Sequence, residues 1–104
     1  MDNQERNKEI AATIIAQMGG ARNLQLMLSA FNFVAIENGV EFRFKGSRKA
    51  NHVRIVLTPM DEYDMTINQI RAFELKECKS FKGIYCDQLQ ECFEEFTGLY
   101  CRLV

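Results

Sequence analysis

The stretch Phe31-Asn-Phe-Val-Ala-Ile-Glu-Asn-Gly-Val-Glu-Phe-Arg-Phe-Lys45 decides the fold. Its first part is aromatic and β-branched, and Asn38-Gly39 follows, the preferred dipeptide of a tight type I′ turn. After the turn, Val40, Phe42 and Phe44 alternate with charged residues, which is the period of a strand with one buried face. The stretch therefore predicts a β-hairpin with apolar side chains on one face and charged side chains on the other.

The chain after this hairpin predicts further extended structure. Beyond a polar loop, apolar and polar residues alternate again at His52–Thr58, which predicts a third strand. Thr58-Pro-Met-Asp61 has the form of a capping box with proline at the first helical position, so a short helical turn is expected there. A further extended stretch is expected between Met65 and Cys78, with Phe73 and Leu75 as its alternating pair.

Helices are expected at both ends of the chain. Apolar residues recur at helical spacing in Asn3–Met18, Ala21–Ser29 and Asp87–Thr97. Gly19-Gly20 ends the first of these segments and Gly98 the last, since glycine readily adopts the left-handed conformation that follows a helix. The order predicts an α+β fold, in which an antiparallel sheet of three to four strands packs with N-terminal and C-terminal helices in a single domain over residues 1–104.

Composition and cysteine spacing restrict the class of protein. The chain has 104 residues, a formal net charge of −1 and 47% hydrophobic residues, which is typical of a globular domain. No run approaches the roughly 18 apolar residues of a membrane span, and the charged N-terminus has no signal-peptide pattern, so a cytoplasmic protein without membrane contact is expected. The cysteines lack the short spacing of zinc ligands, which predicts free thiols, mostly buried, and neither metal nor cofactor. They are Cys78, Cys86, Cys92 and Cys101.

Several blocks of the chain resemble small hypothetical proteins encoded by bacteriophages, prophages and other mobile elements. These blocks are Gln17–Gly20, Asn32–Val34, Asn51–Asp64, Gly83–Gln90 and Glu94–Tyr100. Members of that group carry a Gly-Gly-Lys block where this chain has Gly20-Ala-Arg22, which keeps a cation but not its position. The resemblance implies a bacterial host cell, a cytoplasmic location and a phage-related role, and it implies no site residues.

A basic segment from Arg43 to Arg54 contains five cations and no acid. Cations on a β-ribbon and at its loop tip can follow a phosphate backbone, because neutralisation of phosphates by Lys and Arg is the main term in affinity for nucleic acid. The alternative interpretation is the solvated face of a half-buried sheet. The candidate nucleic-acid-binding residues are Arg43, Lys45, Arg48, Lys49 and Arg54.

An acidic face is expected on the C-terminal helix. Such a face is most often a solvated surface, and its functional interpretation is a docking surface for a basic partner protein. The candidate protein-binding residues are Asp87, Glu91, Glu94 and Glu95.

A second group of carboxylates has a weak similarity to the pattern of metal-dependent nucleases. Asp61, Glu62 and Asp64 precede Glu74-Leu-Lys76, and in such enzymes two carboxylates hold Mg²⁺ while a lysine assists the attacking water. A Glu-x-Lys on a strand arises easily by chance, and capping and turn chemistry already explain Asp61 and Asp64. We therefore assign no catalytic and no metal-binding residue.

These observations predict a small non-enzymatic binding module that contacts nucleic acid through a basic β-hairpin edge. The alternatives are an inhibitor or adaptor acting on a host protein, for example one of a host-defence system, and a metal-dependent nuclease. The sequence leaves the choice between nucleic acid and a host protein undecided. The apolar tail Leu99–Val104 packs either within the chain or on another chain, the latter giving a homodimer.

Overall fold

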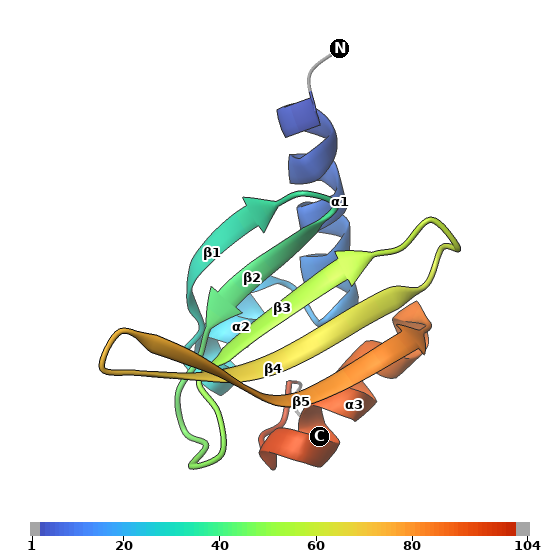
Figure 1. The fold of residues 1–104 in the computed structure, drawn as a ribbon. Helices are drawn as coiled ribbons and strands as arrows, with labels where there is room; N and C mark the ends of the chain where they lie inside the picture. The colour runs from blue at the N-terminus through green and yellow to red at the C-terminus, as the bar shows by residue number, and fades with distance from the viewer. Residues whose placement is uncertain (1–2, 102–104) are drawn as a thin grey trace.

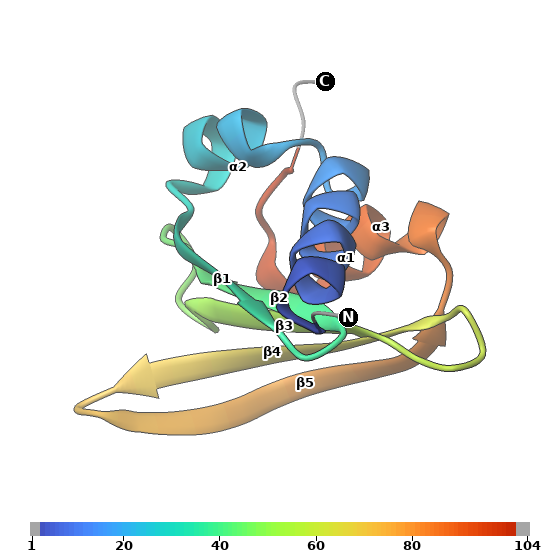
Figure 2. The same cartoon turned by 90° about the horizontal axis from the view of Figure 1, so that it is seen from above.

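Every helix of the described chain lies on one face of a five-stranded antiparallel sheet, whose strands follow chain order (Figure 1, Figure 2). The structure, a computed structural model, describes residues 3–101. The strands are β1 (Phe31–Ile36), β2 (Gly39–Arg43), β3 (His52–Leu57), β4 (Tyr63–Arg71) and β5 (Glu74–Ile84). The helices are α1 (Asn3–Gln17), α2 (Ala21–Leu28) and α3 (Leu89–Thr97), with a short 3-10 helix η1 (Cys86–Gln88) before α3. The α+β class is confirmed, with five strands in place of the three to four expected.

The core fills the space between the sheet and the helices. Phe42 of β2 and Phe44, just after β2, are each only 1% exposed, and Phe44 meets Phe93 of α3 edge to face with ring centroids 4.9 Å apart. Ile14 from α1 and Ile55 from β3 are fully buried in the same cluster. Each such side chain stabilises the fold by about 1.5–3 kcal/mol. The expected alternation of β2 and β3 is therefore confirmed, and it determines which face of the sheet the helices cover.

The turn of the first hairpin differs from the expected one. Ile36 pairs with Gly39, so the two loop residues are Glu37 and Asn38, and Asn38 adopts the left-handed region with φ 58°. Asparagine tolerates this conformation better than most residues. Gly39 already belongs to β2, where a Cβ atom would collide with the carbonyl oxygen of Ile55. The glycine is thus required by the close approach of β3 and not by the turn itself.

The single extended stretch expected between Met65 and Cys78 is in fact part of a long hairpin. β4 has nine residues and β5 has eleven, and their tip projects beyond the other strands (Figure 1). Ala72 and Phe73 form the turn with φ of 52° and 68°, and the Phe73 side chain is fully exposed. The expectation that Phe73 and Leu75 alternate within one strand is therefore wrong, because Phe73 lies in the turn.

The expectation of a helical turn at Thr58–Asp61 is also wrong. These residues form a tight connection between β3 and β4, closed by the Thr58 N–H, which donates to the Glu62 carbonyl oxygen at 2.8 Å. The Thr58 hydroxyl oxygen accepts from the backbone N–H of Met60 at 3.2 Å. The Thr58 side chain acts as the expected capping acceptor, but the connection leads into strand β4 and not into a helix.

The three helices lie where the sequence predicts them, although α3 begins at Leu89 because the expected first residues Asp87 and Gln88 belong to η1. α1 and α2 end within one residue of the expected positions, and Gly98 follows α3 in the left-handed conformation with φ 77°. Within residues 3–101 no helix is long and apolar enough to cross a membrane.

The described part of the tail packs within the chain. Leu99 contacts the core, and Cys101 is fully buried, with its N–H donating to Glu94 Oε2 at 2.9 Å and its carbonyl oxygen accepting from Asn23 Nδ2 at 2.6 Å. Tyr100 is 60% exposed, and Leu103 and Val104 lie outside the described residues.

The four cysteines form no disulfide with one another, and Cys101 alone of the four is buried. Cys86 is exposed, and Cys78 and Cys92 are partly exposed. The expectation of mostly buried thiols is therefore wrong, because Cys78 lies on an edge strand and Cys86 in the connection that leads to α3.

Candidate functional site

The face of the sheet opposite the helices is uncovered and carries most of the candidate residues (Figure 2). The strand register sets two rows of side chains across this face. The first row runs through Phe31, Arg43, His52, Asn68 and Glu77. The second row runs through Val34, Glu41, Arg54, Thr66 and Ser80. Polar and charged groups from non-adjacent strands are thus held within about 20 Å of one another, since neighbouring strands lie about 4.8 Å apart.

One corner of the open face combines cations with an aromatic ring. The guanidinium carbon of Arg43 lies 5.6 Å from the centroid of the Phe31 ring, and Lys45 Nζ lies 5.3 Å from the same centroid. Both distances are in the range of cation–π contacts. Among residues 3–101, neither cation has a carboxylate within 4 Å. We call Phe31, Arg43 and Lys45 the cationic corner.

A second feature is a hollow of about 340 Å³ beside this corner. We call it the polar hollow, because all but one of its lining residues are polar or charged. Its lining residues are Glu41, His52, Arg54, Thr66, Asn68, Leu75 and Glu77. The hollow spans β2 to β5, so it exists only because the four strands pair in this register.

Two buried polar residues form the base of the polar hollow. His52 is 6% exposed and Asn68 is 2% exposed, although both belong to the open face. Asn68 Nδ2 lies 3.0 Å from His52 Nδ1, and Glu41 Oε2 lies 3.8 Å from His52 Nε2. With Nδ1 accepting from the amide, the ring proton of neutral His52 is on Nε2 and faces Glu41. Asn68 Oδ1 is buried without a hydrogen-bond partner among residues 3–101.

The electrostatic surroundings keep His52 neutral. Burial lowers the pKa of His52 below its ordinary value of 6.5, the Glu41 carboxylate opposes this shift, and the Arg43 and Arg54 guanidinium groups add to it. A neutral imidazole with a fixed tautomer can donate one hydrogen bond into the hollow and cannot act as a charge.

The five cations of the basic segment lie on different surfaces of the folded chain. Arg43, Lys45 and Arg54 lie on the open face, as expected from the alternation. Arg48 is exposed in the loop between β2 and β3, whereas Lys49 Nζ lies 5.4 Å from the ring of Phe96 on α3. Lys49 therefore belongs to the helix side of the molecule, and the five cations do not form one surface.

The four acidic residues expected on the C-terminal helix also differ in their surroundings. Asp87, Glu91 and Glu95 are exposed on η1 and α3. Glu94 is half-buried and accepts from the Cys101 N–H, so it holds the tail in place. Glu95 lines a hollow of about 180 Å³ together with Lys49, between the sheet and α3.

The carboxylates of the nuclease pattern are not brought together. Asp64 is near the start of β4, and Glu74 pairs with Arg71 at the other end of that strand. At about 3.3 Å per residue, this places the two carboxylates roughly 20–25 Å apart. Among residues 3–101 no group of three or more His, Cys, Asp and Glu side chains has the geometry of a metal site.

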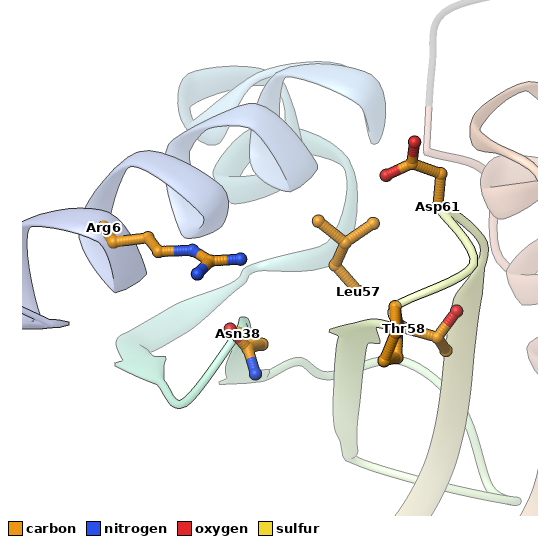
Figure 3. A pocket seen from close by; sticks show the side chains of 6 residues that line it. Arg6, Asn38, Leu57, Thr58 and Asp61 are labelled. Carbon is orange, nitrogen blue, oxygen red and sulfur yellow. The ribbon is translucent and has the colours of Figure 1, made fainter.

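Another hollow, of about 200 Å³, lies between α1 and the connection from β3 to β4 (Figure 3). The Arg6 side chain points across it toward Leu57, and the Asp61 carboxylate lies beyond Leu57 (Figure 3). The Asn38 side chain also lines it, while the backbone N–H of this residue donates to Asn7 Oδ1 at 2.9 Å. This hollow has no buried polar base of the kind that His52 and Asn68 form, so the open face is the stronger candidate.

Sequence reasoning missed Phe31 and Asn68 as candidate residues. An irregularity between Phe31 and Val34, with Asn32 at φ 56°, turns Phe31 to the open face while Phe33 packs on Phe42 in the core. No sequence signal marks this bulge beyond the asparagine itself. Asn68 stands between Ile67 and another polar residue, Gln69, so the sequence does not mark it as a special position.

In comparisons with protein-family models, with curated proteins and with solved structures, no match to this chain was found.

Proposed function

We propose that this protein is a non-enzymatic module that binds single-stranded nucleic acid across the open face of its sheet. The observation that carries the proposal is the cationic corner, where Arg43 and Lys45 flank Phe31 without a carboxylate within 4 Å among the described residues. Cations of this kind neutralise phosphates, and an aromatic ring on the same face offers a stacking surface for a base. Since the opposite face is covered by helices, the open face is the surface that an extended strand can cross.

The test is fluorescence anisotropy with a labelled oligothymidylate at low salt. The double variant R43E/K45E is expected to weaken binding by about tenfold or more, because two attractive charges become repulsive next to phosphate. The matched control is K8E/R22E, which makes the same change in net charge at exposed positions of α1 and α2. Binding that the two double variants weaken equally, or no binding by the unaltered protein, would contradict the proposal.

The phage-related role and the cytoplasm of a bacterial host belong to this proposal and rest on the resemblance of the sequence blocks alone. A protein that acts in a host cell during phage growth has abundant single-stranded nucleic acid available as a partner.

A second candidate function is docking to a host protein, as an inhibitor or adaptor. It is favoured by the projecting tip of the β4–β5 hairpin, where Phe73 is fully exposed and Leu75 is 57% exposed. Exposed aromatic side chains often anchor protein interfaces. The exposed acids Asp87, Glu91 and Glu95 offer a second surface for a basic partner. Affinity purification from the native host distinguishes the two: the F73S variant loses a protein partner, and R43E/K45E loses nucleic acid.

A further inference from the structure

The polar hollow has a property that a merely solvated sheet face lacks. A histidine and an asparagine are buried at its base, on the side of the sheet that no helix within residues 3–101 covers. Burying polar groups costs free energy unless every donor and acceptor is paired. Here Asn68 Oδ1 is unpaired among residues 3–101. The base of the hollow therefore keeps one hydrogen-bond acceptor that no described residue uses.

The side chains that line the hollow include both hydrogen-bond donors and hydrogen-bond acceptors. Glu41 and Arg54 are cross-strand partners, so a carboxylate and a guanidinium stand side by side. Glu77 on β5 adds a second carboxylate next to Asn68. A ligand with two adjacent donors beside an acceptor can therefore pair with the carboxylate and the guanidinium at the same time.

We propose that the polar hollow binds one base of the nucleic acid and prefers guanine, an inference that rests on the proposed function. The Watson–Crick edge of guanine has two adjacent donors, N1–H and the N2 amino group, which a carboxylate can accept together. The neighbouring O6 accepts from a guanidinium, the commonest partner of guanine in base recognition. Adenine, cytosine and thymine each lack the pair of adjacent donors beside an acceptor. Glu41 therefore takes the two donors, and Arg54 donates to O6.

The position of the hollow suits a base whose phosphate lies on the cationic corner. Arg43 is the direct cross-strand neighbour of His52, and Asn68 lies one strand further, so the corner and the hollow base are roughly 10 Å apart. Single-stranded nucleic acid is recognised by placing splayed bases against side chains while cations hold the backbone.

The experiment measures the affinity of the full chain for labelled oligothymidylates that carry a single guanine, adenine or cytosine at the centre. The guanine oligonucleotide is expected to bind about five- to tenfold more tightly than the plain oligothymidylate, in line with one good pair of hydrogen bonds to a base edge. Glu41→Gln is expected to abolish this preference, measured as the ratio of the affinities for the guanine and the plain oligonucleotide. The matched control Glu37→Gln, in the β1–β2 turn outside the hollow, is expected to retain the preference.

A second measurement does not depend on a variant. The chain has one histidine, so the His52 ring gives a single set of NMR resonances that needs no assignment by mutation. Guanosine monophosphate is expected to shift these resonances and adenosine monophosphate to leave them in place. Equal binding of all oligonucleotides would overturn the guanine site and leave the proposed function standing. No binding of any oligonucleotide would overturn both.

Discussion

Asn68 Nδ2 donates to His52 Nδ1 at 3.0 Å across the ladder between β3 and β4, and this contact determines the state of the only histidine. An imidazole that accepts at Nδ1 is neutral, and protonation would remove that hydrogen bond. Burial lowers the pKa of His52, in agreement with the contact. The charged groups around the ring are Glu41 and Arg43 from β2, Arg54 from β3 and Glu77 from β5.

The first prediction is a loss of stability at mildly acidic pH. Because the pKa of His52 is lower in the folded chain than its ordinary 6.5, the unfolded chain takes up a proton first. The neutral ring therefore contributes stability that is fully present above pH 6.5 and is lost as pH falls through the lower folded pKa. Urea unfolding curves at several pH values between about 7.5 and 5 should show this loss. His52→Gln should remove it, and an equal pH dependence in both proteins would contradict the prediction.

The second prediction concerns the salt dependence of nucleic-acid binding. Three of the five candidate cations, Arg43, Lys45 and Arg54, lie on the open face, and if these three neutralise phosphates, the logarithm of the affinity should fall with the logarithm of salt with a slope of about −2 for a single strand. Lys49→Glu should leave this slope unchanged, because Lys49 lies against Phe96 on the helix side. Arg54→Glu should reduce it. If Lys49→Glu changes the slope more than Arg54→Glu does, then the division of the cations between two surfaces is wrong, and the single basic segment expected from the sequence is supported.

Alternation along β2 and β3 predicted which face is buried, because Phe42 and Val53 have no other apolar environment than the core. The helix ends were equally readable, since glycine at Gly98 removes the steric cost of a left-handed residue. Local chemistry therefore determined the two layers and the orientation of Arg43, Lys45 and Arg54.

Features that depend on strand register could not be predicted from the sequence. The Ala72-Phe73 turn has none of the usual turn residues, so the boundary between β4 and β5 has no local signal. The bulge near Asn32 reverses the face that Phe31 occupies. The pairing of His52 with Asn68 depends on the length of the connection from β3 to β4. These features depend on tertiary structure, and the polar hollow depends on the same strand register.

The third prediction concerns the strained turn at the hairpin tip. Ala72 has φ 52°, a conformation that alanine adopts at a cost and asparagine tolerates. Ala72→Asn should therefore slow hydrogen exchange at the neighbouring hydrogen-bonded pair Gln69 and Lys76 by about two- to fivefold, through a gain of roughly 0.5–1 kcal/mol in local stability. Ala12→Asn, an exposed position of α1, is the control and should leave exchange at the tip unchanged. Faster exchange in Ala72→Asn would contradict the turn geometry.

The fourth prediction is an order of thiol reactivity. Cys86 is exposed and should react first with a disulfide reagent, whereas Cys101 should react only on unfolding. Burial raises the pKa of Cys92, and the Glu95 and Glu91 carboxylates add to the shift, so its thiolate is scarce and its reaction slow. Titration in denaturant without reductant should give four thiols. Cys86→Ser should remove the fastest phase and Cys78→Ser should retain it; fewer than four thiols would indicate a disulfide.

The fifth prediction concerns the C-terminal tail. Leu99 contacts the core, and the buried Cys101 is held through its backbone by Glu94 and Asn23. Deleting residues 99–104 should lower the free energy of unfolding by about 2–4 kcal/mol, because it removes buried apolar area and leaves the Asn23 amide without this acceptor. The oligomeric state in solution should stay the same. Leu99→Ala should reproduce part of the loss, and Tyr100→Ala, at a 60% exposed position, should cost little.

Two other outcomes of the deletion have different meanings. If the shortened chain keeps its stability and changes from dimer to monomer, then the tail is an interface between copies and its packing on the core is secondary. If neither stability nor association changes, then the burial of Cys101 does not contribute to the folded state as argued. Thermal unfolding together with sedimentation of both proteins separates these cases, because core packing acts on stability at every protein concentration whereas an interface between copies makes stability depend on concentration.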